Sequence, residues 1–236
     1  MLYYIYKVKE DKNMESEVLN RLLAKLDSHQ TIQLTEEEER VVIASLSSSD
    51  LIDYGSSRAT YEFKGKYVVK IPMAEGGVNQ CKVERNFYLN YGHSGAFAHI
   101  YAYGKLITIM ELLTDTAYFE LDELYCQKDN DSDFVSDDII EVIELANELT
   151  EYDGGDNGQV GYSQLQDKWV LYDYGYTHDY DRDKIVDDVF SWIDEINPIE
   201  HALWMLDNDT IPTKSEMYEL VYDAVKERRR EEDEEE

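Results

Sequence analysis

Cysteine, proline and long apolar runs are all scarce in this sequence. Its 236 residues include 2 cysteines, Cys81 and Cys126, and 3 prolines. Two distant thiols form neither a disulfide framework nor a CxxC metal pair, so we expect both to be reduced, as in a cytoplasm. No apolar run approaches the roughly 20 residues that span a bilayer. The first residues lack a basic start followed by an apolar stretch, so no signal peptide is expected.

Basic side chains are also few. The chain has 22 Lys and Arg against 52 Asp and Glu, which gives a formal net charge of -30. Because such a surface repels phosphate backbones and anionic lipid, we expect no direct nucleic-acid binding, no membrane binding and a preference for basic partners. Repulsion along the acidic run at the end predicts a disordered tail over residues 229–236. That tail is either solubilising or a clamp for a basic partner.

Apolar spacing in the first half predicts helices followed by strands. Residues 14–27 carry an i, i+4, i+8 apolar stripe, and Thr35 begins a second helix with capping-box spacing. Residues 59–71 are typical of two strands joined by a tight turn at Lys64-Gly65-Lys66. A helix over 78–90 and strands over 98–103 and 106–112 are expected next.

The second half is mainly helical by the same criteria. Helices are expected over 139–149, 185–193, 199–206 and 215–227, with a short buried strand over 169–172. Strands first and helices later indicate the α+β class with a two-lobed layout. We attribute these apolar stripes to the core, so they carry no information about chemistry.

Two segments of the first half can carry chemistry. Gly55-Ser56-Ser57 is a small-residue loop that enters a strand, where backbone amides can approach phosphates; the alternative is an ordinary surface turn. Lys70 lies inside the apolar strand, and burying an unpaired ammonium is costly. Lys70 therefore needs an anionic partner, unless its ammonium reaches water at the strand end.

Two carboxylates can complete such a site. Glu84 lies in the expected helix 78–90 and can pair with Lys70 if that helix packs on the sheet. Asp173 directly follows the buried strand, with Gly175 close behind, which presents its carboxylate at a strand end. A Mg²⁺ ion that bridges phosphates can be held there. The alternative is an ordinary Asp-x-Gly turn.

The order of these segments, which ends in Asp173-Tyr174-Gly175, resembles the protein-kinase superfamily. In detail it is similar to small kinase-like proteins encoded by bacteriophages, in which the phosphate loop reads Gly-Ser-Ser-Arg and Asp-Tyr-Gly replaces Asp-Phe-Gly. The resemblance covers about residues 50 to 180. It implies a protein-kinase-like two-lobed fold with a small β-rich N-lobe, a helical C-lobe and extra N-terminal helices.

The resemblance also implies a site for ATP and Mg²⁺. Lys70, paired with Glu84, would hold the α- and β-phosphates, and Asp173 would hold Mg²⁺. The remaining nucleotide contacts would come from Gly55, Ser56 and Ser57 over the phosphates and from Glu111 and Leu112 at the hinge beside adenine.

The stretch that matches the kinase catalytic loop departs from the family. In kinases an Asp precedes a metal-binding Asn by about five positions and positions the attacking hydroxyl. Here the alignment puts Gln159 at the Asn position and Gly154, which has no side chain, at the Asp position. Asp153 and Asp156 are then the candidates for the carboxylate. Asn157, like Gln159, is a candidate for the second metal ligand.

These features predict an atypical kinase or a pseudokinase that binds ATP and Mg²⁺ and acts on a host protein with a basic surface, in the host cytoplasm. The expected organisation is a helical extension over 1–50, an N-lobe over 51–112, a C-lobe over 113–228 and the tail over 229–236. The alternative is an acidic phage inhibitor that masks a basic host surface or mimics nucleic acid. The net charge favours the alternative, whereas the ordered motifs favour the kinase-like reading.

Overall fold

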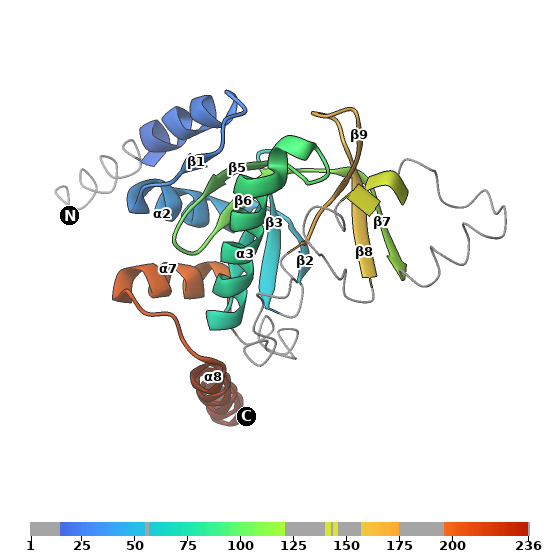
Figure 1. The fold of residues 1–236 in the computed structure, drawn as a ribbon. Coiled ribbons are helices and arrows are strands. Elements are labelled where there is room, and N and C mark those ends of the chain that lie inside the picture. Colours follow the sequence, from blue (N-terminus) through green and yellow to red (C-terminus); the bar gives the residue numbers. More distant parts are fainter. Residues whose placement is uncertain are drawn as a thin grey trace.

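The structure, a computed structural model, has mixed α+β architecture (Figure 1). It describes residues 15–54, 57–120, 140–142, 144–145, 157–174 and 196–235. A six-stranded sheet with helices around it lies beside a three-stranded sheet. The expected helix over 185–193 lies outside the described residues.

The larger sheet contains the β-hairpin that the sequence predicts over residues 59–71. Strand β3 (Arg58–Phe63) pairs antiparallel with β4 (Tyr67–Pro72), so that Phe63 lies opposite Tyr67. Lys64 and Gly65 in the turn both have positive φ, 58° and 64°. A tight hairpin turn uses this backbone conformation, and glycine adopts it without steric cost.

The larger sheet has the order β1-β5-β6-β4-β3-β2. Its other strands are β1 (Ile32–Gln33), β2 (Leu51–Tyr54), β5 (Ile100–Tyr103) and β6 (Thr108–Glu111). Only β1 pairs in parallel, with β5, and the other pairs of this sheet are antiparallel. The strands expected over 98–103 and 106–112 are therefore confirmed as β5 and β6.

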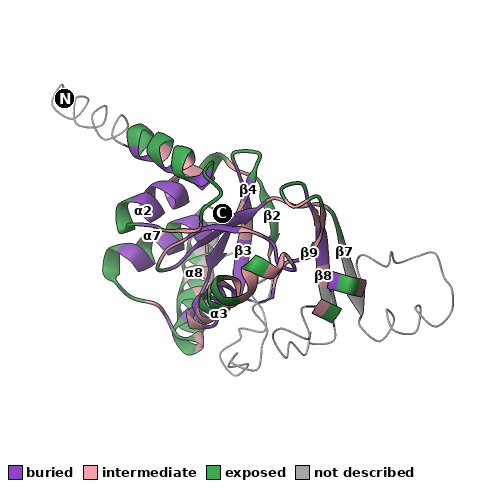
Figure 2. Ribbon diagram, turned by 45° about the horizontal axis from the view of Figure 1, so that its top comes forward, coloured by how far each residue is buried: buried purple, intermediate pink, exposed green. Residues whose placement is uncertain are grey.

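Three helices share the first core with one face of this sheet. They are a helix over residues 15–26, α2 (Glu36–Ser45, followed by a 3₁₀ turn Leu46–Ser48) and α7 (Pro198–Asn208). The predicted capping box of α2 is present, since the Thr35 side chain accepts from the Glu38 amide and the Glu38 carboxylate accepts from the Thr35 amide. Figure 2 shows the buried residues gathered on the sheet and on the faces of α2 and α7.

This first core crosses the expected domain boundaries. Leu22, Leu26 and Val42, from the segment expected to be an N-terminal extension, are fully buried with Val69 of β4. Met205 of α7, a helix expected in the C-lobe, is buried in the same core. The described parts of residues 1–50 are thus part of the sheet's own core, because the apolar stripes of three helices are needed to cover one sheet face.

Helix α3 (Glu75–Tyr91), followed by a 3₁₀ turn Gly92–Ser94, places Glu84 against Lys70 and also contributes Val78 to the first core. Side chains alternate along a strand, so Lys70 points away from the core that holds Val69 and Ile71. Helix α3 approaches the sheet closely at Gly77, where an added Cβ would lie 2.3 Å from the carbonyl oxygen of Ser57.

The smaller sheet has the order β7-β8-β9 and is antiparallel. Its strands are β7 (Thr114–Glu120), β8 (Asn157–Ser163) and β9 (Lys168–Leu171). The expected strand over 169–172 is confirmed as β9. The expected helical C-lobe therefore also contains a sheet, and of the helix expected over 139–149 only residues 140–142 and 144–145 are described, all helical.

A second core joins the two sheets. Phe97 forms a bridge with Leu171, and Tyr174, fully buried, donates its hydroxyl to the carbonyl oxygen of Ala98 at 3.2 Å. Met110 of β6 and Val160 of β8 are buried in the same cluster. This packing fixes the position of the residues that follow β9.

The last helix, α8 (Lys214–Glu235), begins after Thr213, whose side chain accepts from the Glu216 amide. The sequence predicts a disordered tail, whereas the structure continues the helix to Glu235. Glutamate, arginine and lysine are good helix formers, and this propensity offsets their repulsion. In the described parts of the chain, no helix combines the length and apolar character that crossing a membrane requires.

Candidate functional site

Lys70 is buried in β4, with 6% of the residue exposed, and it is paired as the sequence predicts. It lies opposite Thr60 of β3 and Thr108 of β6. Its Nζ is 2.6 Å from Glu84 Oε1 and 3.3 Å from Asp173 Oδ1. The expected ion pair between Lys70 and Glu84 is confirmed, and so is the position of Asp173 beside Lys70.

Glu84 projects from α3 with no exposed side-chain surface. Both of its carboxylate oxygens accept hydrogen bonds, since Oε1 also receives Arg58 Nη2 at 3.2 Å and Oε2 receives Arg58 Nη1 at 2.5 Å. A fully buried carboxylate needs such compensation, because leaving it unpaired in a low-dielectric interior is very costly. Glu84 thereby fixes α3 to two strands of the sheet.

Asp173 presents its carboxylate immediately after β9. Its φ of 57° lies in the left-handed region, which aspartate tolerates better than most residues. Burial raises the pKa of this carboxyl group, but Lys70 and Arg58 beside it lower that pKa far more, to well below its ordinary value. Asp173 is therefore ionised in the folded chain throughout the physiological pH range.

Arg58 is the fourth member of the site, and sequence reasoning missed it. Only 5% of its side chain is exposed, and it forms ion pairs with Glu84 and Asp173. Burial lowers the pKa of its guanidinium, but Glu84 and Asp173 raise it well above the ordinary value. The alternation along β3, with Ala59 and Tyr61 in the core, is the sequence signal that could have placed Arg58 on the face of Lys70.

These four residues form what we call the charge cluster: Arg58, Lys70, Glu84 and Asp173. Two cations and two carboxylates balance each other, so the cluster can be buried without a net charge. Asp173 is its most accessible member, with 23% of the side chain exposed, whereas the other three are at 7% or less. A ligand would therefore reach the cluster at Asp173.

The expected phosphate loop is only partly described. Gly55 and Ser56 lie outside the described residues. Ser57 is buried, and its hydroxyl donates to Gln80 Oε1 of α3 at 2.5 Å. Its carbonyl oxygen accepts from the Met73 amide at 3.1 Å. Ser57 thus joins the loop to α3 in this conformation, and its expected contact with phosphates remains a prediction.

Glu111 and Leu112, the expected hinge contacts, link the two sheets. The Glu111 carboxylate accepts from the His99 amide at 2.7 Å and from Ser163 Oγ at 2.6 Å. Burial raises the pKa of Glu111, and the hydrogen bond from Ser163 opposes this. The backbone amides of Glu111 and Leu112 donate to the carbonyl oxygens of His99 and Lys66. Their expected contact with adenine remains a prediction.

Only two of the four expected catalytic-loop residues are described in the structure. Asp153 and Asp156 lie outside the described residues. Asn157 and Gln159 lie in strand β8, whereas the family alignment puts them in a loop. The carbonyl oxygen of Gln159 accepts from the Tyr172 amide at 2.9 Å, so its backbone lies next to the residue that precedes Asp173.

The described residues contain no preformed metal-ion site made of protein side chains alone. Among them no group of three His, Cys, Asp or Glu side chains is placed to hold a metal. Magnesium, however, is usually held by one or two carboxylates together with substrate phosphates. Asp173 is the only cluster carboxylate with exposed side-chain surface, and its Oδ1 contacts Arg58 and Lys70.

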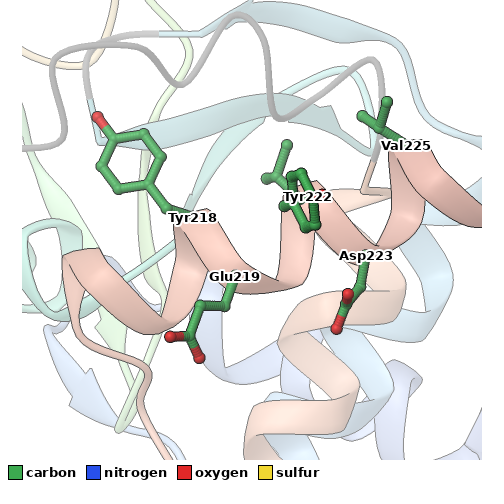
Figure 3. A pocket seen from close by; sticks show the side chains of 6 residues that line it. Tyr218, Glu219, Tyr222, Asp223 and Val225 are labelled. Carbon is green, nitrogen blue, oxygen red and sulfur yellow. The ribbon is translucent and has the colours of Figure 1, made fainter.

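A separate hollow lies along α8. It is lined by Tyr218, Glu219, Val221, Tyr222, Asp223 and Val225. Tyr218 and Val225 point to one side of the helix and Glu219 and Asp223 to the other (Figure 3). This lining of rings, aliphatic groups and carboxylates offers no cation for a phosphate, so we place the candidate ligand site at the charge cluster.

Comparison with known proteins gives loose structural likenesses. Neither a protein-family model nor a curated protein sequence matches this chain. A type-2 SAICAR synthetase in complex with ADP is 14% identical, over 68% of this chain and 98% of its own, with a TM-score of 0.37. The SAICAR synthase of Saccharomyces cerevisiae, complexed with SAICAR, is 10% identical over 75% and 92% (TM-score 0.37). The type-1 SAICAR synthetase structure from Pyrococcus horikoshii OT3 is 17% identical over 70% and 99% (TM-score 0.31).

Proposed function

We propose that this chain is a protein-kinase-like nucleotide-binding protein that holds the phosphates of ATP at the charge cluster. The observation that carries the proposal is the buried Lys70, which bridges Glu84 of α3 and Asp173 after β9 at 2.6 and 3.3 Å. In protein kinases a strand lysine paired with a helix glutamate and an aspartate that holds Mg²⁺ must be in place together.

The positions of these residues along the chain support the same proposal. A small-residue loop precedes β3, the lysine lies on the next strand, the glutamate on the next helix and the aspartate after a later strand. When the nucleotide binds, Lys70 would contact its phosphates, and Mg²⁺, where it is present, would be held at Asp173. The metal would supply positive charge against the phosphate oxygens.

We further propose that the chain acts on a host protein with a basic surface, in line with its resemblance to phage proteins. The formal charge of -30 supports this, because electrostatic complementarity steers association and suppresses wrong partners. The same charge supports the second candidate function, an acidic inhibitor that needs no nucleotide. The two functions differ in whether variants of Lys70 and Asp173 lose biological activity.

A thermal-shift titration tests nucleotide binding directly. A ligand that binds only the folded state at 100 times its Kd stabilises by about 2.7 kcal/mol, which raises Tm by roughly 5 to 10 °C for a domain of this size. We expect ATP with Mg²⁺ to produce such a shift in the wild type and in Lys66→Met. We expect Lys70→Met to remove it.

Lys66 is a matched control for Lys70. It directly precedes β4, in the turn of the hairpin. Its side chain is 49% exposed and forms a surface ion pair with Asp27. The relevant quantity is the ATP-induced change within each variant, so a lower starting Tm in Lys70→Met does not obscure the result. An equal ATP response in both lysine variants would contradict the proposed site.

A further inference from the structure

We propose that Arg58 takes the place of a divalent cation at Asp173, so that the site binds ATP without requiring Mg²⁺. The inference rests on the proposed nucleotide-binding function and concerns its metal dependence. It starts from a single oxygen, Asp173 Oδ1, which contacts both Arg58 Nη2 and Lys70 Nζ. This oxygen belongs to the carboxylate that the family resemblance assigns to Mg²⁺.

Arg58 is held in place independently of Asp173. Its guanidinium binds both carboxylate oxygens of Glu84, at 2.5 Å and 3.2 Å, and Nη1 also lies 3.8 Å from Cys81 Sγ. The fork geometry of arginine allows this bidentate contact to coexist with a third partner, and the group stays charged at every relevant pH. A ligand that draws Asp173 away would therefore still meet Arg58.

The sum of local charges explains why this position matters. A lysine, a glutamate and an aspartate together carry one net negative charge, which repels a polyphosphate unless a metal ion is added. Arg58 raises that sum to zero and places a second cation beside the most exposed carboxylate of the cluster. Bound cations are often the largest charges in such a site, and here a side chain supplies part of that charge.

The wild-type protein alone can decide the question. ATP affinity would be measured by calorimetry and by thermal shift, once with Mg²⁺ and once with EDTA. We expect the two Kd values to agree within about threefold, because Arg58 supplies positive charge to the site whether or not Mg²⁺ is present. A Kd at least tenfold weaker in EDTA would overturn the inference while leaving the proposed nucleotide site intact.

Variants of Arg58 provide the second arm. We expect Arg58→Gln to bind ATP at least tenfold more weakly in EDTA than with Mg²⁺, because Asp173 then needs the metal. If Arg58→Gln does not fold, Arg58→Gln/Asp173→Asn keeps the cluster neutral, and we expect its ATP affinity to be independent of Mg²⁺. A purely structural Arg58 would change Tm but leave the ratio of the two Kd values unchanged, which would contradict the inference.

Absence of any wild-type response to ATP, with or without Mg²⁺, would instead refute the proposed function and this inference with it.

Discussion

The charge cluster makes single side chains unusually important to stability. Buried charges are stable only when opposite charges compensate them. Removing one member leaves an uncompensated buried charge, so it costs far more stability than breaking a surface ion pair. Glu84 is the extreme case, since it is fully buried and bound by both Arg58 and Lys70.

We expect Glu84→Gln to destabilise the fold by about 3 to 5 kcal/mol, because two buried cations would then share Asp173 alone. The control is Glu36→Gln in α2, where the glutamate is 72% exposed and 3.7 Å from Arg40. We expect the control to change stability by about 0.5 kcal/mol or less. Urea unfolding measures both, and equal losses would show that the cluster is not the source.

His99 predicts a pH dependence that carboxylates do not explain. Burial lowers its pKa from 6.5 to about 4, its Nε2 has no hydrogen-bond partner among the described residues, and its ring packs against Tyr88 and Tyr101. The folded state favours the neutral ring, so the unfolded state takes up a proton first as pH falls. Stability should therefore be lost between pH 6.5 and 4, by about 1 to 2 kcal/mol after allowing for partial solvent screening.

The measurement for His99 is the slope of unfolding free energy against pH. We expect His99→Phe to have a shallower slope than the wild type in this window. His201, whose pKa burial also lowers, contributes equally to both proteins. Parallel slopes would assign the pH dependence to other groups.

The sequence identified three of the four cluster residues. Lys70, Glu84 and Asp173 could be found because each departs from its local pattern or completes a known order. Arg58 could not be found this way, because it follows a small-residue loop where a basic residue is expected to face solvent. The alternation of core residues along β3 is the signal that was overlooked, and the pairing of β3 with β4 makes it clear.

At the scale of elements, the docking of α3 determines the site. Gly77 permits it, since a Cβ there would lie 2.3 Å from Ser57 O and 2.9 Å from Pro72 Cβ. Gly77→Ala should therefore destabilise by about 1 to 3 kcal/mol and weaken ATP binding, although alanine is the better helix former by about 1 kcal/mol. Asn79→Ala in the same helix is the control and should not destabilise. Urea unfolding measures the change in stability, and an ATP titration measures the change in affinity. A Gly77→Ala variant that is more stable than the wild type would contradict the close approach of α3 to the sheet.

Helices and strands with regularly spaced apolar residues were predictable from the sequence. A strand that forms only because it pairs with neighbouring strands was not. The hairpin, α2 and α3 follow from alternation, capping and apolar spacing. Strand β8 was not expected, because its sequence, Asn157–Ser163, contains two glycines and only one aliphatic residue, Val160. Glycine weakens a strand on its own, so this strand depends on its neighbours β7 and β9.

The whole molecule is expected to need its N-terminal segment. A chain beginning at residue 51 would lose from the first core five fully buried side chains, Leu22, Leu26, Val42, Ile43 and Leu46. Each contributes about 1.5 to 3 kcal/mol, so the total is comparable to the stability of a whole domain. We expect this shortened chain to show no cooperative urea transition, and co-expression of residues 1–50 to restore one. A cooperative transition without that segment would show that residues 51–236 fold independently.

Phosphotransfer by the usual kinase route is expected to be weak or absent. The proposed kinase-like alignment puts Gly154 at the position of the catalytic aspartate, and loss of a general acid–base group typically removes about 10² to 10⁴ in rate. Radiolabelled ATP with a host lysate measures this. Robust labelling by the wild type that is lost in Asp153→Ala or Asp156→Ala would contradict the expectation and assign one of these residues to catalysis.

Helix α7 has a consequence for how the protein is made. Ile199, Ala202, Met205 and Leu206 complete a core whose other members come mostly from residues before 110. During synthesis, part of the apolar face of the first sheet therefore stays uncovered until α7, which ends at Asn208, has emerged from the ribosome. Such contacts between distant parts of the sequence slow folding and prolong exposure to aggregation. The nascent chain is thus a natural client for a chaperone that shields one face of an unfinished sheet.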